Sequence, residues 1–591
     1  MNRRTSRGSG GLAVVQAAII MCFVVLLGRC AWIALVHGPD YAVRAVQQRS
    51  MDVVVARVRG QIFDRDMRLL AGMPDGLASS WPHRTVVVVF PSLVSGQDEA
   101  LHRLDELIPG PGICAAGPRA INLSPAAYAE VAEIACAVRG IVPLSLPSRY
   151  RGTASHVVGD IEASYEWALG GGDAREVVRL MCDAHGQAIP GLGARRLALG
   201  QAAGWVKLAV DSDLQACVEE ALDSRAPGMA GAVVAMDPWT GQVLAMASRP
   251  MYNLDDVAGS LTQPNAPMIN RAVRPYYPGS IFKVVIAAAA LSTGARSPDS
   301  VYTDTGSIEA GGHTFSCHAR ERGGHGDITF QDAFIHSCNT SFIDAAMQLG
   351  AQPILDFGRA LGIGDLDVAS AVRLPGSIAG VLPQSRTYLG PADLANLALG
   401  QSLVQITPLE AAVMMCAVAN GGVRRRPELV LEACGPDGRR VTRVASVTSP
   451  LQQAEGWGSG SGWDSGSGLE PGLGQGQGQG QDHDQGDRVL REDVAAALRE
   501  MLAGVASRGT AGAALGGMDV AGKTGTAQTG RVDASGAPVF NAWFVGFAPV
   551  ELPRLVVAVL IEGPESGAAA AAPIFGDICE YATGGARGRA R

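Results

Sequence analysis

Residues 277–283 read Tyr-Pro-Gly-Ser-Ile-Phe-Lys, and the apolar run Val-Val-Ile-Ala-Ala-Ala-Ala-Leu follows at once. The Pro-Gly pair is a turn signal, and the alanine-rich run predicts a helix that Gly294 can end. Ser280 would lie in the first turn of this helix, with Lys283 three residues later on the same face. A serine hydroxyl becomes a nucleophile when a nearby base takes its proton, and a lysine becomes that base when burial lowers its pKa. The stretch therefore predicts a buried Ser-Lys pair.

The composition of the basic residues supports this interpretation. The chain has three lysines among its forty-eight Lys and Arg residues, at positions 207, 283 and 523. Because arginine does not release its proton in a protein, a lysine kept in such a chain is what a site needing a deprotonatable amine would retain. Lys523 opens the run Lys-Thr-Gly-Thr at residues 523–526, whereas Lys207 has no such context and is predicted to be a solvated surface residue.

A third motif, Ser337-Cys-Asn339, lies between these two. The patterns S-x-x-K, S-x-N and K-T-G in this chain order are the motifs of penicillin-binding proteins and class A β-lactamases. The separations are 57 residues from Ser280 to Ser337 and 186 from Ser337 to Lys523, which leaves room for a helical lobe and a return to a sheet. On these motifs the sequence resembles a class B, high-molecular-mass penicillin-binding protein, a cell-wall D,D-transpeptidase, over most of residues 12–583.

The resemblance implies a role for each motif residue. Ser280 would be the nucleophile, Lys283 its general base and Ser337 a proton relay. The substrate-binding residues would be Asn339, Lys523, Thr524, Gly525 and Thr526. The substrate would be a peptidoglycan stem peptide ending in D-Ala-D-Ala, and β-lactam antibiotics would acylate the same serine. No cofactor is implied.

The N-terminus predicts a membrane anchor. Residues 1–11 carry three arginines, and an apolar run interrupted by Arg29 fills residues 12–36. About twenty apolar residues span the hydrocarbon of a bilayer, and the Arg-rich end predicts a cytoplasmic tail. A cleavable signal peptide is the alternative, but the run is long and no clear A-x-A site follows it. We therefore expect a single-pass protein of the cell membrane whose catalytic domain is extracytoplasmic.

Beyond the anchor the sequence predicts two α+β domains. Residues 40–205 are expected to form an N-terminal module, which serves as a pedestal or dimerisation module in the resembled family, and residues 206–583 the transpeptidase domain. Strand-like runs within 231–248 and 542–561, with helices between them, predict an antiparallel sheet flanked by helices, with an all-helical lobe. This matches the β-lactamase-like penicilloyl-serine transferase fold that the resemblance implies. The low-complexity Gly, Ser and Gln segment 452–488 predicts a flexible loop within this domain.

The N-terminal module carries further family-like segments. Residues 59–71 are similar to the stretch R-G-x-I-x-D-R-x-G-x-x-L-A, but Met67 stands where a Gly is expected, which argues against a left-handed turn there. Arg149 and the segment His156–Gly159 resemble an R-x-Y…H-x-x-G pattern, and Glu166 fits the acidic residue that follows it. We interpret these residues as structural, with buried Arg and Glu side chains that pair.

One segment is rich in possible metal ligands. Its residues are His313, Cys317, His318, His325, His336 and Cys338. Histidine and cysteine bind zinc, so a metal loop is conceivable. The spacing fits no standard zinc finger, however, and Cys338 lies inside the S-x-N motif, so the sequence predicts no metal site. The eleven cysteines include no C-x-x-C pair and are odd in number, which predicts no disulfide framework.

Together these features predict a membrane-anchored peptidoglycan D,D-transpeptidase, with an S-C-N context that favours the division or sporulation branch. A net charge of −8 argues against nucleic acid as a partner. A β-lactamase is the nearest alternative, but no E-x-x-L-N stretch follows the S-x-N motif. A β-lactam sensor or a non-catalytic division scaffold are further alternatives. Because residues 40–205 show no paired catalytic carboxylate motif, we expect a separate glycosyltransferase, among other cell-wall synthesis proteins, as a partner.

Overall fold

The computed structural model describes residues 8–73, 83–114, 117–136, 138–147, 149–170, 173–183, 189, 194–200, 203–254, 257–384, 388–442, 486–532, 536–563 and 566–584. The chain divides into two compact units. The first unit comprises Met1–Arg59, Asp75–Ser148 and Gly172–Ala202, and the second comprises Gly60–Pro74, Arg149–Gly171 and Ala203–Arg591. This division differs from the expected boundary at residue 205, because two segments of the expected N-terminal module pack with the second unit.

The N-terminal helix has the length and composition of a membrane span. Helix α1 covers Gly8–Val36, and its part Leu12–Val36 has a mean hydropathy of 2.5 and no buried share within the protein. The structure therefore contains a candidate for the anchor expected at these residues. A second helix, α2, follows at Gly38–Gln48.

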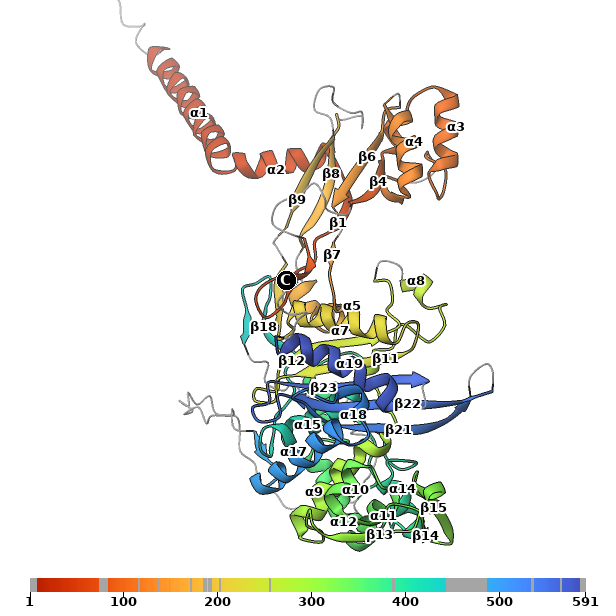
Figure 1. The fold of residues 1–591 in the computed structure, drawn as a ribbon. Coiled ribbons are helices and arrows are strands. Elements are labelled where there is room, and N and C mark those ends of the chain that lie inside the picture. The colour runs from red at the N-terminus through yellow and green to blue at the C-terminus, as the bar shows by residue number, and fades with distance from the viewer. Residues whose placement is uncertain are drawn as a thin grey trace, which may run out of the picture. The chain divides into compact units, whose positions relative to one another are not determined.

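Two three-stranded antiparallel sheets build the rest of the first unit (Figure 1). One has the order β1-β8-β9, with strands Ser50–Arg57, Arg175–Met181 and Ala194–Leu199. The other has the order β5-β4-β6, with strands Arg119–Leu123, His83–Val89 and Ile141–Pro147. The helices are α3 at Asp98–Leu107, α4 at Pro125–Ala135 and the 3₁₀ helix η1 at Pro91–Leu93. Val87 and Val89 of β4 pack with Leu104 and Val131 of these helices, because alternate β4 side chains face the helical layer.

A five-stranded antiparallel sheet is the centre of the second unit. Its order is β12-β11-β23-β22-β21, with strands Val243–Arg249, Gly231–Met236, Leu555–Gly563, Pro538–Ala548 and Ala521–Val532. The two hairpins expected from the sequence are both present. They join where Val233 of β11 lies opposite Val559 of β23. The expectation of an antiparallel sheet built from the two ends of the domain is therefore confirmed.

Helices cover both faces of this sheet, which explains why every residue of β11 and β12 is buried. Helices α7 (Ser212–Arg225) and α19 (Gly567–Ala582) pack together on one face, and α15 (Pro408–Ala419) and α17 (Glu492–Ser507) pack on the other (Figure 1). Asp211 begins α7, since its carboxylate accepts hydrogen bonds from the amides of residues 213 and 214.

The helical lobe follows the nucleophile turn. Its elements are η3 (Gly279–Phe282), α9 (Lys283–Thr293), α10 (Phe330–Ile335), α11 (Asn339–Leu349), α12 (Ala351–Ala360), α13 (Leu366–Ala371) and α14 (Pro391–Ala398). Gly294 ends α9 in the left-handed conformation, as expected. The lobe is not helical throughout. Two antiparallel ribbons interrupt it, β13 (Val301–Asp304) with β16 (Gly326–Thr329) and β14 (Ser307–Ala310) with β15 (His313–Ser316).

A second sheet explains why early segments belong to this unit. Its order is β19-β18-β10-β2-β3-β7, with strands Arg440–Thr442, Val430–Cys434, Trp205–Leu208, Gln61–Phe63, Leu69–Gly72 and Tyr150–Arg151. Shorter elements of the unit are α5 (Ser155–Ser164), α6 (Glu166–Leu169), α8 (Val257–Ser260), α18 (Gly512–Leu515), η2 (Arg271–Val273) and η4 (Arg320–Arg322). Residues 60–74 and 149–171 therefore pack with the second unit, because β2 hydrogen-bonds to β10, β3 to β2 and β7 to β3.

One expectation for these segments needs correction. Met67 adopts a φ of 63°, so the turn is left-handed although the expected glycine is missing. Asp64 supports this turn by accepting hydrogen bonds from the amides of residues 66 and 68. The expected pairing of buried Arg and Glu side chains is present, since Arg149 Nε lies 2.8 Å from Glu162 Oε1.

Most of the predicted low-complexity loop, residues 452–485, lies outside the described residues. Its last two residues form β20, Asp487–Arg488, which pairs with β17 at Val423–Arg424. The last two residues of the predicted loop, 487 and 488, are thus part of a short strand.

Candidate active site

Two glycines fix the turn that carries Ser280. Gly279 has a φ of 57°, and a Cβ added to it would lie 2.4 Å from the carbonyl oxygen of Thr526. The amide of Gly279 donates to the carbonyl of Gly400 at 3.0 Å, and a Cβ added to Gly400 would lie 2.1 Å from the Gly279 oxygen. Neither position leaves room for a side chain, so both require glycine. The half-buried Ser280 is thereby held beside strand β21.

The residue before this turn is tied to the central sheet. The indole Nε1 of Trp543, on β22, donates to the carbonyl of Tyr277 at 2.9 Å. A Cβ added to Gly525 of the K-T-G motif would lie 2.7 Å from the carbonyl oxygen of Pro278. The glycine of the motif therefore allows the nucleophile turn to approach the strand closely, which is a positional reason for Gly525.

Lys283 is fully buried and joins two of the motifs. Its Nζ donates to the carbonyl oxygen of Ser337 at 2.8 Å, to Ser337 Oγ at 3.2 Å and to Asn339 Oδ1 at 2.8 Å. Nζ also lies 5.4 Å from the centroid of the Phe342 ring. Lys283 is the first residue of α9, and its amine is thus directed at both polar residues of the S-x-N motif at the start of α11.

Burial changes the acidity of both motif lysines. Desolvation lowers the pKa of Lys283 to about 8. Burial also lowers the pKa of Lys523 well below its ordinary value, and the nearby charge of Lys283 adds to this effect. A buried lysine with a pKa near neutrality can accept a proton at physiological pH, as a general base must.

The S-x-N motif is a strained turn at the start of a helix. Ser337 has a φ of 56°, which is unusual for a residue with a side chain. Cys338 caps the N-terminus of α11, and Asn339 is its first residue. The side-chain nitrogen Nδ2 of Asn339 donates to the carbonyl of Ser316 at 3.1 Å. Asn339 therefore bridges Lys283 and the ribbon β14–β15.

The K-T-G motif lies on the edge strand β21. Lys523 Nζ donates to the Thr524 carbonyl at 3.3 Å and lies 5.8 Å from the centroid of Phe334. Thr524 Oγ1 is 2.6 Å from Thr510 Oγ1. Thr526 Oγ1 accepts a hydrogen bond from the Gly567 amide at 3.3 Å. The two threonine hydroxyls thus have protein partners, one of which, Thr510, carried no sequence signal because it belongs to no motif.

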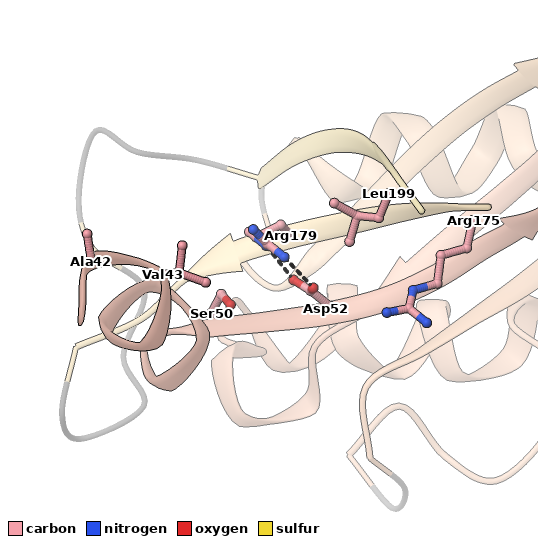
Figure 2. Close-up of a pocket in the computed structure, with 7 residues that line it drawn as sticks. All are labelled: Ala42, Val43, Ser50, Asp52, Arg175, Arg179 and Leu199. Carbon is pink, nitrogen blue, oxygen red and sulfur yellow. Dashed lines mark hydrogen bonds and ion pairs between the residues drawn. The ribbon is translucent and has the colours of Figure 1, made fainter. Parts of the chain in front are cut away.

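A separate cavity of about 610 Å³ lies in the first unit. Figure 2 shows its lining, in which Arg179 makes two hydrogen bonds of 2.7 Å to Asp52. The lining residues are Ala42, Val43, Ser50, Asp52, Arg175, Arg179 and Leu199. No residue of the three motifs lines this cavity.

Comparison with known proteins assigns the family. The model of the penicillin binding protein transpeptidase domain matches residues 231–580. This chain belongs to the penicillin-binding protein transpeptidase family. The predicted family, the α+β fold class and the enzyme class are therefore confirmed.

Named relatives of this penicillin-binding protein agree. Peptidoglycan D,D-transpeptidase PbpA of Mycobacterium tuberculosis H37Rv is 31% identical over 376 residues, covering 60% of this chain and 67% of PbpA. Peptidoglycan D,D-transpeptidase FtsI of Escherichia coli K12 is 25% identical over 604 residues, covering 96% of this chain and 90% of FtsI. The crystal structure of penicillin binding protein 3 from M. tuberculosis, complexed with ampicillin, matches with a TM-score of 0.58 and 23% identity, covering 91% and 97% of the two chains.

Proposed function

We propose that this penicillin-binding protein cross-links peptidoglycan stem peptides through an acyl-enzyme on Ser280, and that β-lactams acylate the same residue. The two curated relatives are named peptidoglycan D,D-transpeptidases. The observation that carries the proposal is the buried Lys283, three residues after Ser280, with its Nζ directed at Ser337 and Asn339. This arrangement supports a buried base in contact with a proton relay, three residues after the proposed nucleophile.

In the proposed acylation, neutral Lys283 takes the hydroxyl proton of Ser280. Ser280 Oγ then attacks the carbonyl carbon of the penultimate D-Ala. The bond to the terminal D-Ala breaks, and its nitrogen receives a proton through Ser337. The terminal D-Ala leaves, and the rest of the stem peptide stays on Ser280 as an ester.

Two backbone amides would stabilise the oxyanion that forms during attack. We assign the N–H groups of Ser280 and Thr526 to this role, because the tight packing of the neighbouring Gly279 on Thr526 brings the two backbones together. A donor of this kind is worth about 3–4 kcal/mol of transition-state stabilisation. Asn339 would hydrogen-bond the amide backbone of the stem peptide.

The K-T-G strand would bind the terminal carboxylate of the substrate. Lys523 supplies the positive charge, and an arriving carboxylate would favour its protonated form, which burial disfavours in the free enzyme. Thr524 and Thr526 would offer hydroxyl protons, and Gly525 would leave space for close approach. An amine from a neighbouring stem peptide then attacks the ester, which closes the cross-link and releases Ser280.

The test is intact-mass analysis of the full chain in detergent after incubation with a penicillin, beside Ser280→Ala. One stable adduct per chain that is lost in the variant supports the proposal. Rapid drug turnover without an adduct would indicate a β-lactamase. A folded protein that does not react would instead be a non-catalytic scaffold.

We also propose the predicted topology and domain order. Residues 1–11 would be cytoplasmic, residues 12–36 would span the membrane once, and residues 40–205 and 206–583 would lie outside with a glycosyltransferase as a partner. The candidate span in α1 supports this order. Protease treatment of intact cells tests it, because only an extracytoplasmic catalytic domain would be digested.

A further inference from the structure

Four possible metal ligands meet beside the S-x-N motif. Asp304, Cys317, His325 and Cys338 each offer one ligand atom, and these atoms all lie within 4.8 Å of one another. The residues come from the end of β13, the loop after β15, the position just before β16 and the N-terminus of α11. Asp304 and both cysteines are buried, and His325 is half-buried. The cluster thus gathers four separate chain segments at one buried point.

Its spacing agrees with a tetrahedral metal site. Cys317 Sγ lies 3.9 Å from Cys338 Sγ and 3.6 Å from His325 Nδ1, and Cys338 Sγ lies 3.5 Å from Asp304 Oδ2. A tetrahedral Zn²⁺ with bonds of about 2.3 Å to sulfur and about 2.1 Å to nitrogen or oxygen separates its ligands by about 3.4–3.8 Å. Three pairs of ligand atoms therefore already have nearly the required separation.

The pair formed by His325 and Asp304 is closer than a metal site requires, and the remaining two pairs lie within 4.8 Å. His325 Nδ1 and Asp304 Oδ2 are 2.6 Å apart and share a hydrogen bond. An ion between them would replace the shared proton and widen this pair by about 0.8 Å. This is a movement that two side chains can make without a change of the backbone.

Neighbouring groups orient the ligands. Asp304 Oδ1 accepts hydrogen bonds from Thr340 Oγ1 and the Gly306 amide, both at 2.8 Å, so that Oδ2 faces the Cys338 sulfur and His325 Nδ1. Thr340 Oγ1 also lies 3.2 Å from Cys338 Sγ. Metal ligands in proteins are held by outer contacts of this kind.

We propose that Asp304, Cys317, His325 and Cys338 bind one Zn²⁺ ion as a structural site. Two thiolates, an imidazole and a carboxylate suit Zn²⁺, whereas Mg²⁺ and Ca²⁺ require oxygen ligands. Four protein ligands leave no open position, so the ion orders the chain and does not activate water. The sequence prediction of no metal site judged linear spacing among His and Cys and therefore missed Asp304.

The ion would hold the S-x-N turn in its strained form. Cys338 lies between Ser337 and Asn339, both of which bind Lys283. Binding of the Cys338 sulfur to an ion fixed to three other segments would stabilise the positive φ of Ser337. The proposal of a metal site does not depend on the proposed function. Only its consequence for acylation does.

The test measures metal in the full chain, purified in detergent without a chelator or a metal-binding tag. We expect about one zinc per chain by mass spectrometry of the elements. Cys317→Ser and His325→Gln should each reduce it at least tenfold. His336→Gln is the matched control, because the His336 ring stacks on His325 with 6.3 Å between the ring centroids, but His336 is not one of the four proposed ligands. Co²⁺ exchanged into the wild type should show thiolate charge-transfer absorption that Cys317→Ser weakens.

Chelation of the folded wild type provides a readout even where a variant does not fold. Removal of zinc should slow acylation by a penicillin about tenfold, and added Zn²⁺ should restore the rate. If no penicillin reacts at all, the measured zinc content still tests whether the four residues bind the ion. Protein without bound zinc overturns the proposal, whether alkylation finds both cysteines free or finds Cys317 and Cys338 joined in a disulfide. Zinc that persists equally in Cys317→Ser and His325→Gln also overturns it.

Discussion

The Nζ atom of Lys283 lies 2.8 Å from Oδ1 of Asn339, a residue 56 positions later in the chain. The same nitrogen also donates to the carbonyl and hydroxyl oxygens of Ser337. The amine of the first motif is therefore positioned by the second. Since Lys283 is completely buried, desolvation favours the neutral form of its amine. Ser337 and Asn339 remain next to this amine when its proton is removed.

Replacement of Lys283 by arginine tests its role as a base. Arginine keeps the positive charge but does not release its proton, so we expect acylation by a penicillin to slow by about 10²- to 10⁴-fold. Stopped-flow measurement of the second-order rate constant checks this. Lys207→Arg on β10 is the control and should react at the wild-type rate. A Lys283→Arg enzyme within threefold of wild type would exclude a proton transfer to this lysine.

Acylation should depend on pH in a defined window. Because burial lowers the pKa of Lys283 to about 8, the neutral base is scarce below this pH and predominates above it. The rate constant should rise about tenfold per pH unit below pH 8 and level off above it. Measurements from pH 6 to 9.5, with circular dichroism at each pH to confirm folding, give the profile. A flat profile over this range would contradict a titrating base.

Gly279→Ala should abolish acylation while the protein remains folded. The added Cβ would lie 2.4 Å from the carbonyl oxygen of Thr526 and must push the nucleophile turn away from β21. Gly294→Ala is the matched control, because its φ of 75° is also positive but its Cβ would meet no atom within 4 Å. We expect the control to lose about 1 kcal/mol of stability and to acylate normally. Equal acylation by the two variants would show that the close contact does not position Ser280.

Met67→Gly should stabilise the protein. Met67 holds a φ of 63° although 48% of it is exposed, so glycine relieves backbone strain and loses little packing. The gain should be about 0.5–1 kcal/mol after the entropy cost of glycine. Urea denaturation measures it as a higher midpoint. Met251, which is 45% exposed and is not among the residues with positive φ, provides the control Met251→Gly, which should not stabilise. A lower midpoint for Met67→Gly would show that the turn is not strained.

Much of the fold could be predicted because it depends on local patterns. The apolar run after Ser280 forms the expected helix, which ends at Gly294. The strand-like runs within residues 231–248 and 542–561 form the two hairpins of the central sheet. The strands at residues 61–63, 69–72 and 150–151 were expected in the N-terminal module but lie in the second compact unit. They join its sheet because β2 pairs with the distant β10, and β3 and β7 follow β2 in the strand order. Such pairing is decided by long-range contacts that leave no local pattern.

The sequence by itself determined the chemistry available to this protein. Because lysine is so rare in the chain, Lys283 and Lys523 could be identified as candidate site residues from the sequence. The order of the three motifs predicted the family that comparison confirmed. Only the tertiary structure decided the partners of these groups. It brought Asn339 to Lys283 and Gly400 to Gly279, and it placed Asp304 beside Cys338. The physical reason is that burial and the meeting of ligand atoms are properties of the packed lobe, where segments distant in the chain exclude water together.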